Sequence, residues 1–251
     1  MAPTAVIIGS SARSDPAKGI TARSAYSGED TKAGNMCGVL ADCGSVHGWL
    51  TGHKGVHVAP SAFLASPEPT VVNKARVVEE IQKAAASRYD YIIIYYSGHG
   101  EPLEGSWCFD NGETLSPEEV LGLIPLDKTC MIISDSCFSG KWVTLASSTG
   151  RKRLWVQSSS SPDKVSCDSP EGGTFTQHWL KANHSVWSWG QAFKAAAFSN
   201  VTFVVKGIAN SFREISKPMT NSRAARHVHP LGNGEAICHF DCWTVMCTHW
   251  V

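Results

Sequence analysis

Short apolar runs, separated by polar and glycine-containing turns, are the main pattern along this chain. Each run is continuous rather than alternating, as in strands that are buried on both faces of a parallel sheet. The pattern therefore predicts buried strands over residues 5–9, 90–96, 129–134, 154–158 and 201–205.

Between several of these runs, the apolar residues are spaced as on one face of a helix. Val77 and Ile81 lie on one face of a helix expected over 71–87, which Thr70 would cap. The alternation of strands and helices predicts an α/β fold, a three-layer α/β/α sandwich with a mostly parallel central sheet. The other expected elements are a helix at 39–50 and a strand at 56–59 within a glycine-rich segment, a hairpin at 107–113, and helices at 116–124, 176–181 and 187–198.

The amino-acid composition is that of an ordinary globular protein with one domain. The 251 residues carry 22 Lys and Arg against 22 Asp and Glu, and no linker divides them, so we expect a single domain over 1–251. The zero net charge disfavours a nucleic-acid partner. We expect no signal peptide and no membrane span, because no apolar run approaches the ~20 residues a span requires. Nine cysteines, an odd count, favour free thiols and the cytoplasm.

Two residues of complementary chemistry follow consecutive predicted strands. His99 lies three residues past the strand that ends at Tyr96, and Cys137 lies three residues past the strand that ends at Ser134. Parallel strands place their carboxyl ends at one edge of the sheet, so the imidazole and the thiol should face each other there. An imidazole can accept the proton of a thiol and later protonate a leaving amine. A helix just after Cys137 is expected to lower the pKa of this thiol further.

Each of the two residues also has a structural interpretation. His99 alone can be a turn residue, and Cys137 alone can be a small buried hydrophobe. The placement of both at successive strand ends favours a catalytic pair.

Two segments carry a resemblance to a known family. Tyr95-Tyr-Ser-Gly-His-Gly100 and Asp135-Ser-Cys-Phe-Ser-Gly140 resemble the histidine and cysteine motifs of caspase-like cysteine peptidases, and are more similar to those of metacaspases than of animal caspases. The resemblance implies a caspase-like fold, a Cys137–His99 dyad, and an oxyanion hole formed by the backbone amides of Gly100 and Cys137. It is clear over about 5–198 and fades over 200–251, which we expect to complete the domain.

The chain departs from the family pattern around the nucleophile. The caspase motif Gln-Ala-Cys is absent, so specificity for aspartate loses its support. Phe138 stands where metacaspases commonly carry histidine. Residues 139–153 are too few for the long cleavable linker of caspases, so we expect no activating cleavage.

The substrate side chain can be predicted from the residue two positions before the nucleophile. Asp135 shares a strand face with Cys137, so its carboxylate is placed to pair with a basic P1 side chain. The resemblance implies the same role and adds Asp42 and Ser97, with Ser158 at the end of the next strand, as substrate-binding residues. Together they imply cleavage after Arg or Lys. The alternative is that Asp135 caps the helix after Cys137.

Three further clusters have simpler interpretations. The C-terminal Cys and His residues have no standard zinc spacing and can also be packing residues. The acidic residues after His99 can form a calcium site, although a solvated loop is favoured, so we expect no cofactor and no bound metal. The clusters are Cys238, His239, Cys242, Cys247 and His249; Glu101, Glu104, Asp110 and Glu113; and the surface histidines His47, His53 and His57.

The sequence therefore predicts a cysteine endopeptidase that acts on protein or peptide substrates through a thioester at Cys137, as a monomer or homodimer in the cytoplasm. The first alternative is a non-catalytic caspase-like scaffold or regulator in a cell-death or defence pathway. A weaker one is acyl or peptide transfer by the same dyad.

Overall fold

A computed structural model gives the fold of this chain. It describes residues 3–11, 36, 38–54, 56–65, 72–109, 111–151, 153–166, 168–169, 171–183, 202–205, 227–231 and 235–239. The strands are β1 (Thr4–Ser10), β2 (Phe63–Ala65), β3 (Tyr91–Gly98), β4 (Trp107–Cys108), β5 (Thr114–Leu115), β6 (Thr129–Asp135), β7 (Leu154–Ser158), β8 (Thr202–Val205), β9 (His227–Leu231) and β10 (Glu235–His239). The helices are α1 (Val39–Lys54), α2 (Lys74–Ala86), α3 (Pro117–Leu123), α4 (Gly140–Ser148) and α5 (Thr174–Asn183), with a 3₁₀ turn at Pro60–Ala62.

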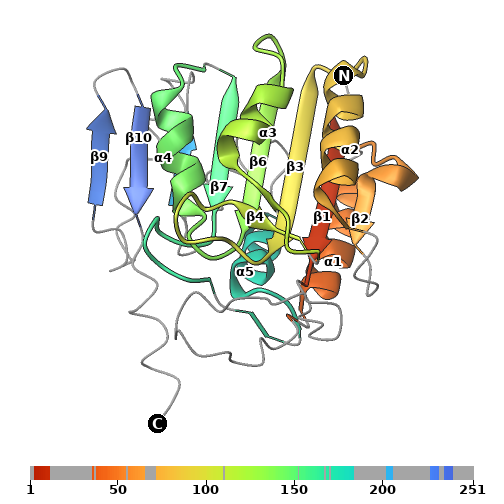
Figure 1. The fold of residues 1–251 in the computed structure, drawn as a ribbon, viewed down its shortest axis with the longest axis horizontal. Helices are drawn as coiled ribbons and strands as arrows, with labels where there is room; N and C mark the ends of the chain where they lie inside the picture. The colour runs from red at the N-terminus through yellow and green to blue at the C-terminus, as the bar shows by residue number, and fades with distance from the viewer. Residues whose placement is uncertain are drawn as a thin grey trace.

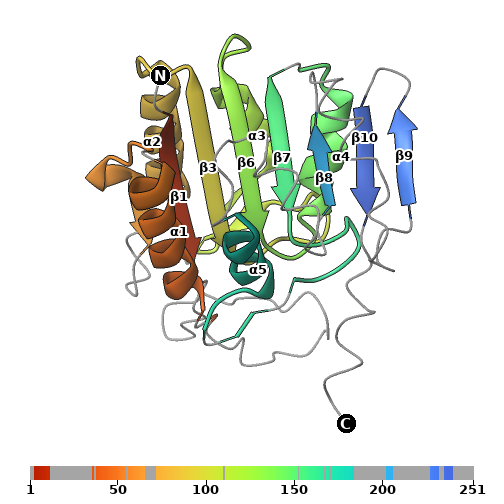
Figure 2. The same cartoon turned by 180° about the vertical axis from the view of Figure 1, so that it is seen from behind.

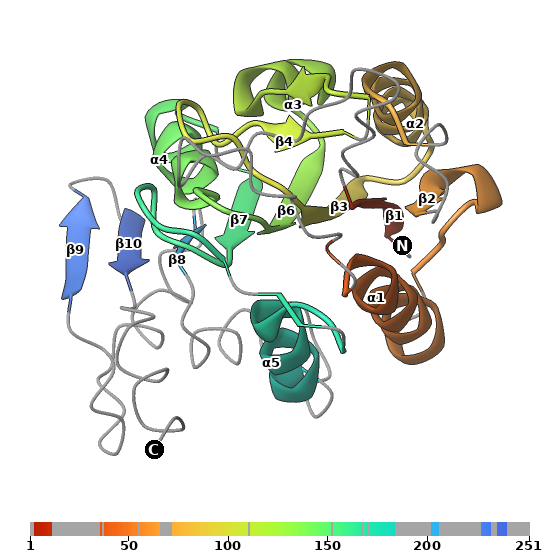
Figure 3. The same cartoon turned by 60° about the horizontal axis from the view of Figure 1, so that its bottom comes forward.

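The described strands form a central sheet in the order β2-β1-β3-β6-β7-β8-β10-β9. The first five run parallel, whereas β8 pairs antiparallel with β7, and β10 pairs antiparallel with both β8 and β9. Helices α2, α3 and α4 cover one face of the sheet, and α1 and α5 cover the other (Figures 1, 2 and 3). The predicted α/β/α sandwich with a mostly parallel sheet is confirmed.

Alternate residues of the central strands supply two apolar cores. Ile92 and Ile94 of β3 pack under α2, α3 and α4, whereas Ile93 and Tyr95 pack under α1 and α5. All four side chains are fully buried. Burial on both faces explains why these strands read as continuous apolar runs instead of alternating ones.

The structure corrects several predicted boundaries. Helix α2 begins three residues later than expected, and its cap is Asn73, whose Oδ1 accepts the N–H of Arg76 at 3.0 Å. Thr70 lies outside the described residues. The strand expected at 56–59 is wrong: only His57 forms a bridge, to Thr4, and the strand beside β1 is β2.

Other predicted elements agree or lie beyond the described ranges. Helix α1 continues to Lys54 rather than ending at residue 50, and the hairpin near 107–113 is the β4–β5 pair. The helix start at Ser116 is confirmed as a capping box with Glu119. The helix expected at 187–198 falls outside the described residues.

Candidate active site

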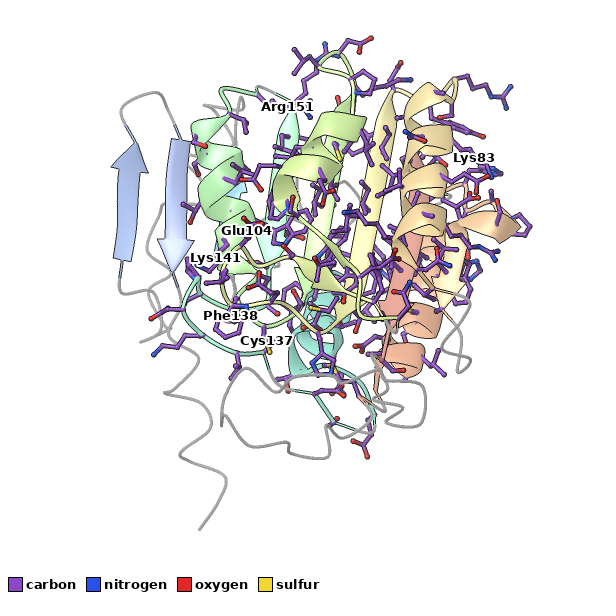
Figure 4. The ribbon with its side chains drawn as sticks, in the orientation of Figure 1. Lys83, Glu104, Cys137, Phe138, Lys141 and Arg151 are labelled. Carbon is purple, nitrogen blue, oxygen red and sulfur yellow. The ribbon has the colours of Figure 1, made fainter. Side chains whose placement is uncertain are left out.

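The predicted catalytic residues follow two neighbouring strands at the carboxyl edge of the sheet. In the β3–β6 register, Ser97 pairs with Asp135, so His99 and Cys137 each stand two residues past that last pair. Figure 4 labels Cys137 at this edge, close to the end of β6. The expectation that the two strands are neighbours, with their ends at one edge, is confirmed.

His99 is fixed through its backbone and has a free ring nitrogen. Its carbonyl oxygen accepts hydrogen bonds from the Tyr96 hydroxyl at 2.8 Å and from the Cys108 N–H at 3.1 Å. Its buried Nε2 atom has no hydrogen-bond partner among the described residues. Burial lowers the pKa of this imidazole, so it is neutral at pH 7 and can accept a proton.

Cys137 sits at a tight turn between β6 and α4. Phe138, the next residue, has φ of 57°, a left-handed conformation that non-glycine residues rarely adopt. Its backbone N–H is held by the carbonyl oxygen of Lys164 at 2.7 Å. Sharp turns with such strained backbone are frequent at catalytic nucleophiles.

The pKa of the Cys137 thiol is shifted upward, opposite to the direction expected from the following helix. Helix α4 begins at Gly140, beyond the turn. Burial raises the pKa of Cys137, the negative charge of Asp135 raises it further, and hydrogen bonds from the backbone, including one from Ser166, only partly compensate. The resting thiol is therefore neutral.

Buried serine hydroxyls fix the backbone around Cys137. The N–H of Ser136 donates to Ser159 Oγ at 3.1 Å, and the N–H of Ser139 donates to Ser160 Oγ at 3.0 Å. The hydroxyls of Ser159 and Ser160 both donate to the Ser136 carbonyl oxygen. The residues before and after Cys137 are thus tied to the segment that follows β7.

Gly100 lies directly against the turn that carries Cys137. A Cβ atom at this position would collide with the carbonyl oxygen of Cys137 and stand 3.2 Å from Ser136 Oγ. Only glycine allows this approach of two backbones. The contact brings the predicted oxyanion-hole residues, Gly100 and Cys137, together.

The predicted substrate-binding residues Asp42, Ser97 and Asp135 also meet. Asp42 comes from α1, and its carboxylate accepts the Ser97 hydroxyl at 2.9 Å and the Gly173 N–H at 2.9 and 3.0 Å. A Cβ atom at Gly173 would collide with Asp135 Oδ2 and stand 3.1 Å from Asp42 Oδ2. Gly173 therefore packs against both carboxylates, which are 2% and 4% exposed.

Asp135 is held by donors from two segments that follow β7. Its Oδ1 accepts the Ser166 hydroxyl at 2.9 Å, and its Oδ2 accepts both the N–H and the hydroxyl of Thr176, at 3.2 and 2.7 Å. Thr176 lies in the first turn of α5. The alternative that Asp135 caps the helix after Cys137 is therefore wrong, because the helix it caps is α5.

Burial makes both carboxyl groups harder to ionise. Burial, together with the nearby charge of Asp135, raises the pKa of Asp42 to about 7. Burial also raises the pKa of Asp135, against which its Thr176 and Ser166 donors act. Both carboxyl groups therefore hold a proton more readily than an exposed aspartic acid does.

Ser158, the remaining predicted binding residue, is fully buried at the end of β7. It pairs with Ser134 in the sheet, and its hydroxyl donates to the carbonyl oxygen of Ser160 at 3.3 Å. Ser158 therefore belongs to the same group of buried serines as Ser159 and Ser160, which fix the backbone around Cys137. Sequence reasoning missed Ser166 and Gly173 as partners of the carboxylates; the second belongs to a glycine pair before a helix, a signal of close backbone approach.

Among the described residues, no group of three or more His, Cys, Asp or Glu side chains is arranged to hold a metal ion. The Glu101 carboxylate accepts the N–H groups of Leu103 and Glu104, and so closes its own turn. Glu113 accepts the N–H of Lys74 at 3.1 Å. Asp110 and the C-terminal residues Cys242, Cys247 and His249 lie outside the described residues.

Comparison with known proteins identifies the domain. The model of the caspase domain family, Peptidase C14, matches residues 4–185. Caspase-1 from Spodoptera frugiperda superposes with a TM-score of 0.53 at 14% identity, over 78% of this chain and 75% of that chain. Protein GSU0716 from Geobacter sulfurreducens gives 0.52 at 19% identity, over 78% and 89%. At these identities, the likeness to both structures concerns the fold alone.

A curated relative is much longer than this chain. Transmembrane protein 168-A from Danio rerio is 30% identical over 122 residues, which is 45% of this chain but 18% of the relative. The chain thus matches less than a fifth of the relative's length. Within the described ranges of the present chain, no helix is long and apolar enough to cross a membrane.

Proposed function

The chain belongs to the caspase domain family, and on this premise we propose that it is a cysteine endopeptidase that cleaves after Arg or Lys. The observation that carries the proposal is the convergence, at one sheet edge, of a thiol, an imidazole with a free Nε2 and a buried carboxylate pair. Perturbed titratable groups that gather in this way favour a catalytic site.

The two neutral partners suit general-base catalysis. As a peptide carbonyl approaches Cys137, Nε2 of His99 accepts the thiol proton, and the sulfur forms a bond to the carbonyl carbon. The oxyanion would be stabilised by the backbone N–H groups of Gly100 and Cys137. The imidazolium then protonates the departing amine, which leaves a thioester.

Water completes the cycle. His99, neutral again, accepts a proton from water, whose oxygen attacks the thioester carbonyl. The acid product leaves, and the proton returns to the Cys137 sulfur. No group is oxidised or reduced in either step.

Two carboxylates near the nucleophile favour a cationic P1 side chain. Asp135 stands two residues before Cys137, and Asp42 lies across Gly173 from it. A guanidinium or ammonium group against Asp135 would displace the proton on Asp42 and pair with both charges. An acidic P1 side chain would be repelled by the same pair.

A panel of fluorogenic peptides with Arg, Lys, Asp, Asn or Leu at P1 tests the proposal. The wild type should cleave the Arg and Lys peptides, and Asp135→Ala should reduce their kcat/KM by about 100-fold, because a substrate cation is left without its partner. Asp127→Ala removes an exposed aspartate at the opposite edge and should change nothing. Preference for Asp at P1 would refute the specificity, and the absence of any hydrolysis would instead favour a binding module.

A further inference from the structure

Tyr96, near the carboxyl end of β3, folds back over the end of its own strand to reach the backbone of His99. Its hydroxyl lies 2.8 Å from the carbonyl oxygen of His99 and 2.9 Å from that of Cys108, and shares its one proton between them. Gly98 leaves room for this path, because a Cβ atom there would stand 2.6 Å from the Tyr96 hydroxyl oxygen. One hydroxyl, on a fully buried side chain, thus joins two backbone segments.

The two segments are the sides of a short hairpin that begins at His99. The Cys108 N–H donates to the His99 carbonyl oxygen at 3.1 Å, and Gly100 pairs with Trp107 in an antiparallel bridge. Both hydrogen bonds that join His99 to other described residues therefore end at its carbonyl oxygen, and Nε2 of its ring has no partner among them. The imidazole is therefore positioned through its backbone, which Tyr96 holds.

Tyr96 is also the first of three stacked aromatic rings that run from β3 to α4. The ring centroids of Tyr96 and Trp107 are 4.7 Å apart, and those of Trp107 and Trp142 are 4.2 Å apart. The Trp107 Nε1–H donates to Ser134 Oγ at 2.9 Å, and the Trp142 Nε1–H donates to the Gly105 carbonyl oxygen at 2.6 Å. The hairpin is thereby fixed to the end of β6 and to α4, the two elements that flank the proposed nucleophile.

We propose that Tyr96 is a positioning residue: its hydroxyl holds the His99 backbone so that the imidazole Nε2 stays within reach of the Cys137 thiol. The stacked rings fix the hydroxyl against the hairpin. A base must lie within hydrogen-bond reach of the proton it takes, and small displacements of such a group cost large factors in rate. The inference rests on the proposed function and adds to it a residue that acts only through His99.

Alkylation of Cys137 by iodoacetamide at pH 7, followed by mass spectrometry of the Cys137 peptide, tests the proposal without a substrate. His99→Ala should slow alkylation by about tenfold or more, because the thiol loses the base that takes its proton. Tyr96→Phe keeps the stacked ring, removes only the hydroxyl, and should slow alkylation by about three- to tenfold. In the His99→Ala background, Tyr96→Phe should have no further effect, because the hydroxyl acts through His99.

Tyr91→Phe makes the same change at the other end of β3 and is the matched control, with the wild-type rate expected. A Tyr96→Phe protein that alkylates at the wild-type rate would overturn the inference, and so would an equal slowing with and without His99. Equal slowing in Tyr91→Phe, or a Tyr96→Phe protein whose thermal melt shows that it does not fold, would show that the hydroxyl serves stability instead. An unchanged rate in His99→Ala would also overturn the inference, since no base would then act on the thiol.

The outcomes separate this inference from the proposed function. If Tyr96→Phe slows alkylation only when His99 is present, but the wild type cleaves no peptide, the positioning role stands and the peptidase assignment fails. If both hold, kcat for Arg peptides should fall by about tenfold in Tyr96→Phe with little change in KM.

Discussion

Strands β3 and β6 bury side chains of opposite character at their two ends. Their first halves carry apolar side chains at no more than 1% exposure, and their carboxyl ends bury polar and acidic groups almost as completely. The first set is Ile92, Ile93, Ile94, Met131, Ile132 and Ile133, and the second is Ser97, Ser134 and Asp135, with Ser136 directly after β6.

The difference separates stability from chemistry. Burial of apolar area is favourable by roughly 25 cal/mol per Å². Burial of a carboxylate is unfavourable even when it is hydrogen-bonded, and replacing such groups by apolar ones often stabilises a protein. A sheet edge that keeps Asp42 and Asp135 buried together is therefore better explained by a function than by folding.

The largest expected effect falls on turnover. Cys137→Ala and His99→Ala should each reduce peptide hydrolysis by about 10³-fold or more. Both residues lie past the strand ends, outside the apolar cores, so the free energy of unfolding should change by less than about 1 kcal/mol. Steady-state kinetics check the expected loss of hydrolysis, and urea unfolding of the same samples checks the free energy of unfolding. Wild-type turnover in Cys137→Ala would refute the assignment of Cys137 as the nucleophile.

The opposite pattern is expected in the apolar half. Ile132→Ala removes a fully buried side chain of β6 and should lower the free energy of unfolding by about 2–5 kcal/mol. Activity per folded molecule should be nearly unchanged, because Ile132 touches no reacting group. A folded Ile132→Ala variant with a 10³-fold loss of kcat would show that the two regions are not separable.

The stability of an Asp42→Asn variant, measured as a function of pH, tests whether the buried carboxyl group of Asp42 destabilises the fold. Its folded-state pKa of about 7 lies above the ordinary 3.8, so the folded state holds the proton more tightly and stability falls as pH rises from about 4 to 7. At pH 8 the asparagine variant should melt about 4 °C or more above the wild type, while at pH 4 the two should agree.

The same variant should be a poorer enzyme. Removal of the second carboxylate should lower kcat/KM for Arg peptides by about tenfold. In the wild type, kcat/KM should rise through pH 7 as Asp42 ionises, and the Asp42→Asn variant should lack this rise. A variant that is more stable yet less active marks a residue kept for function. A melting temperature of Asp42→Asn below that of the wild type at pH 8 would contradict the raised pKa of Asp42.

The smallest effect is expected at the opposite edge of the sheet, where Figure 4 labels Arg151 far from Cys137. Arg151 and Arg153 bind the carbonyl oxygens of Ile124 and Asp127 there. A variant with Arg151, Lys152 and Arg153 changed to Gln should keep kcat/KM within about twofold, because no activating cut is expected between β6 and β7. Loss of turnover in the folded variant would show that cleavage is required.

Sequence reasoning reached furthest where one short segment determines the outcome. The apolar runs predicted the parallel strands β1, β3, β6 and β7, but not β2, and the run at 201–205 forms the antiparallel strand β8 instead of a parallel one. The positions of Tyr96 and Ser134 predicted the neighbouring strand ends that His99 and Cys137 follow. Ser116 predicted the start of α3 for the same reason, since capping is local.

Long-range partners could not be predicted in this way. The carboxylate of Asp135 is satisfied by Ser166 and Thr176, which lie 31 and 41 positions away, and nothing near Asp135 identifies them. The direction of the thiol pKa was also wrong, because burial of Cys137 depends on segments that pack over it and outweighs the following helix. Burial and long-range donors arise only once the chain is folded.

The central claim is that Cys137 attacks a carbonyl adjacent to a basic side chain. An acyloxymethylketone peptide with Arg at P1, incubated with the full chain and followed by intact mass and peptide mapping, tests it most directly. We predict one equivalent of label on Cys137 in the wild type, none in Cys137→Ala, and slow labelling in Asp135→Ala. Equal labelling by the matching Asp peptide, or label on another cysteine while Cys137 stays free, would contradict the account.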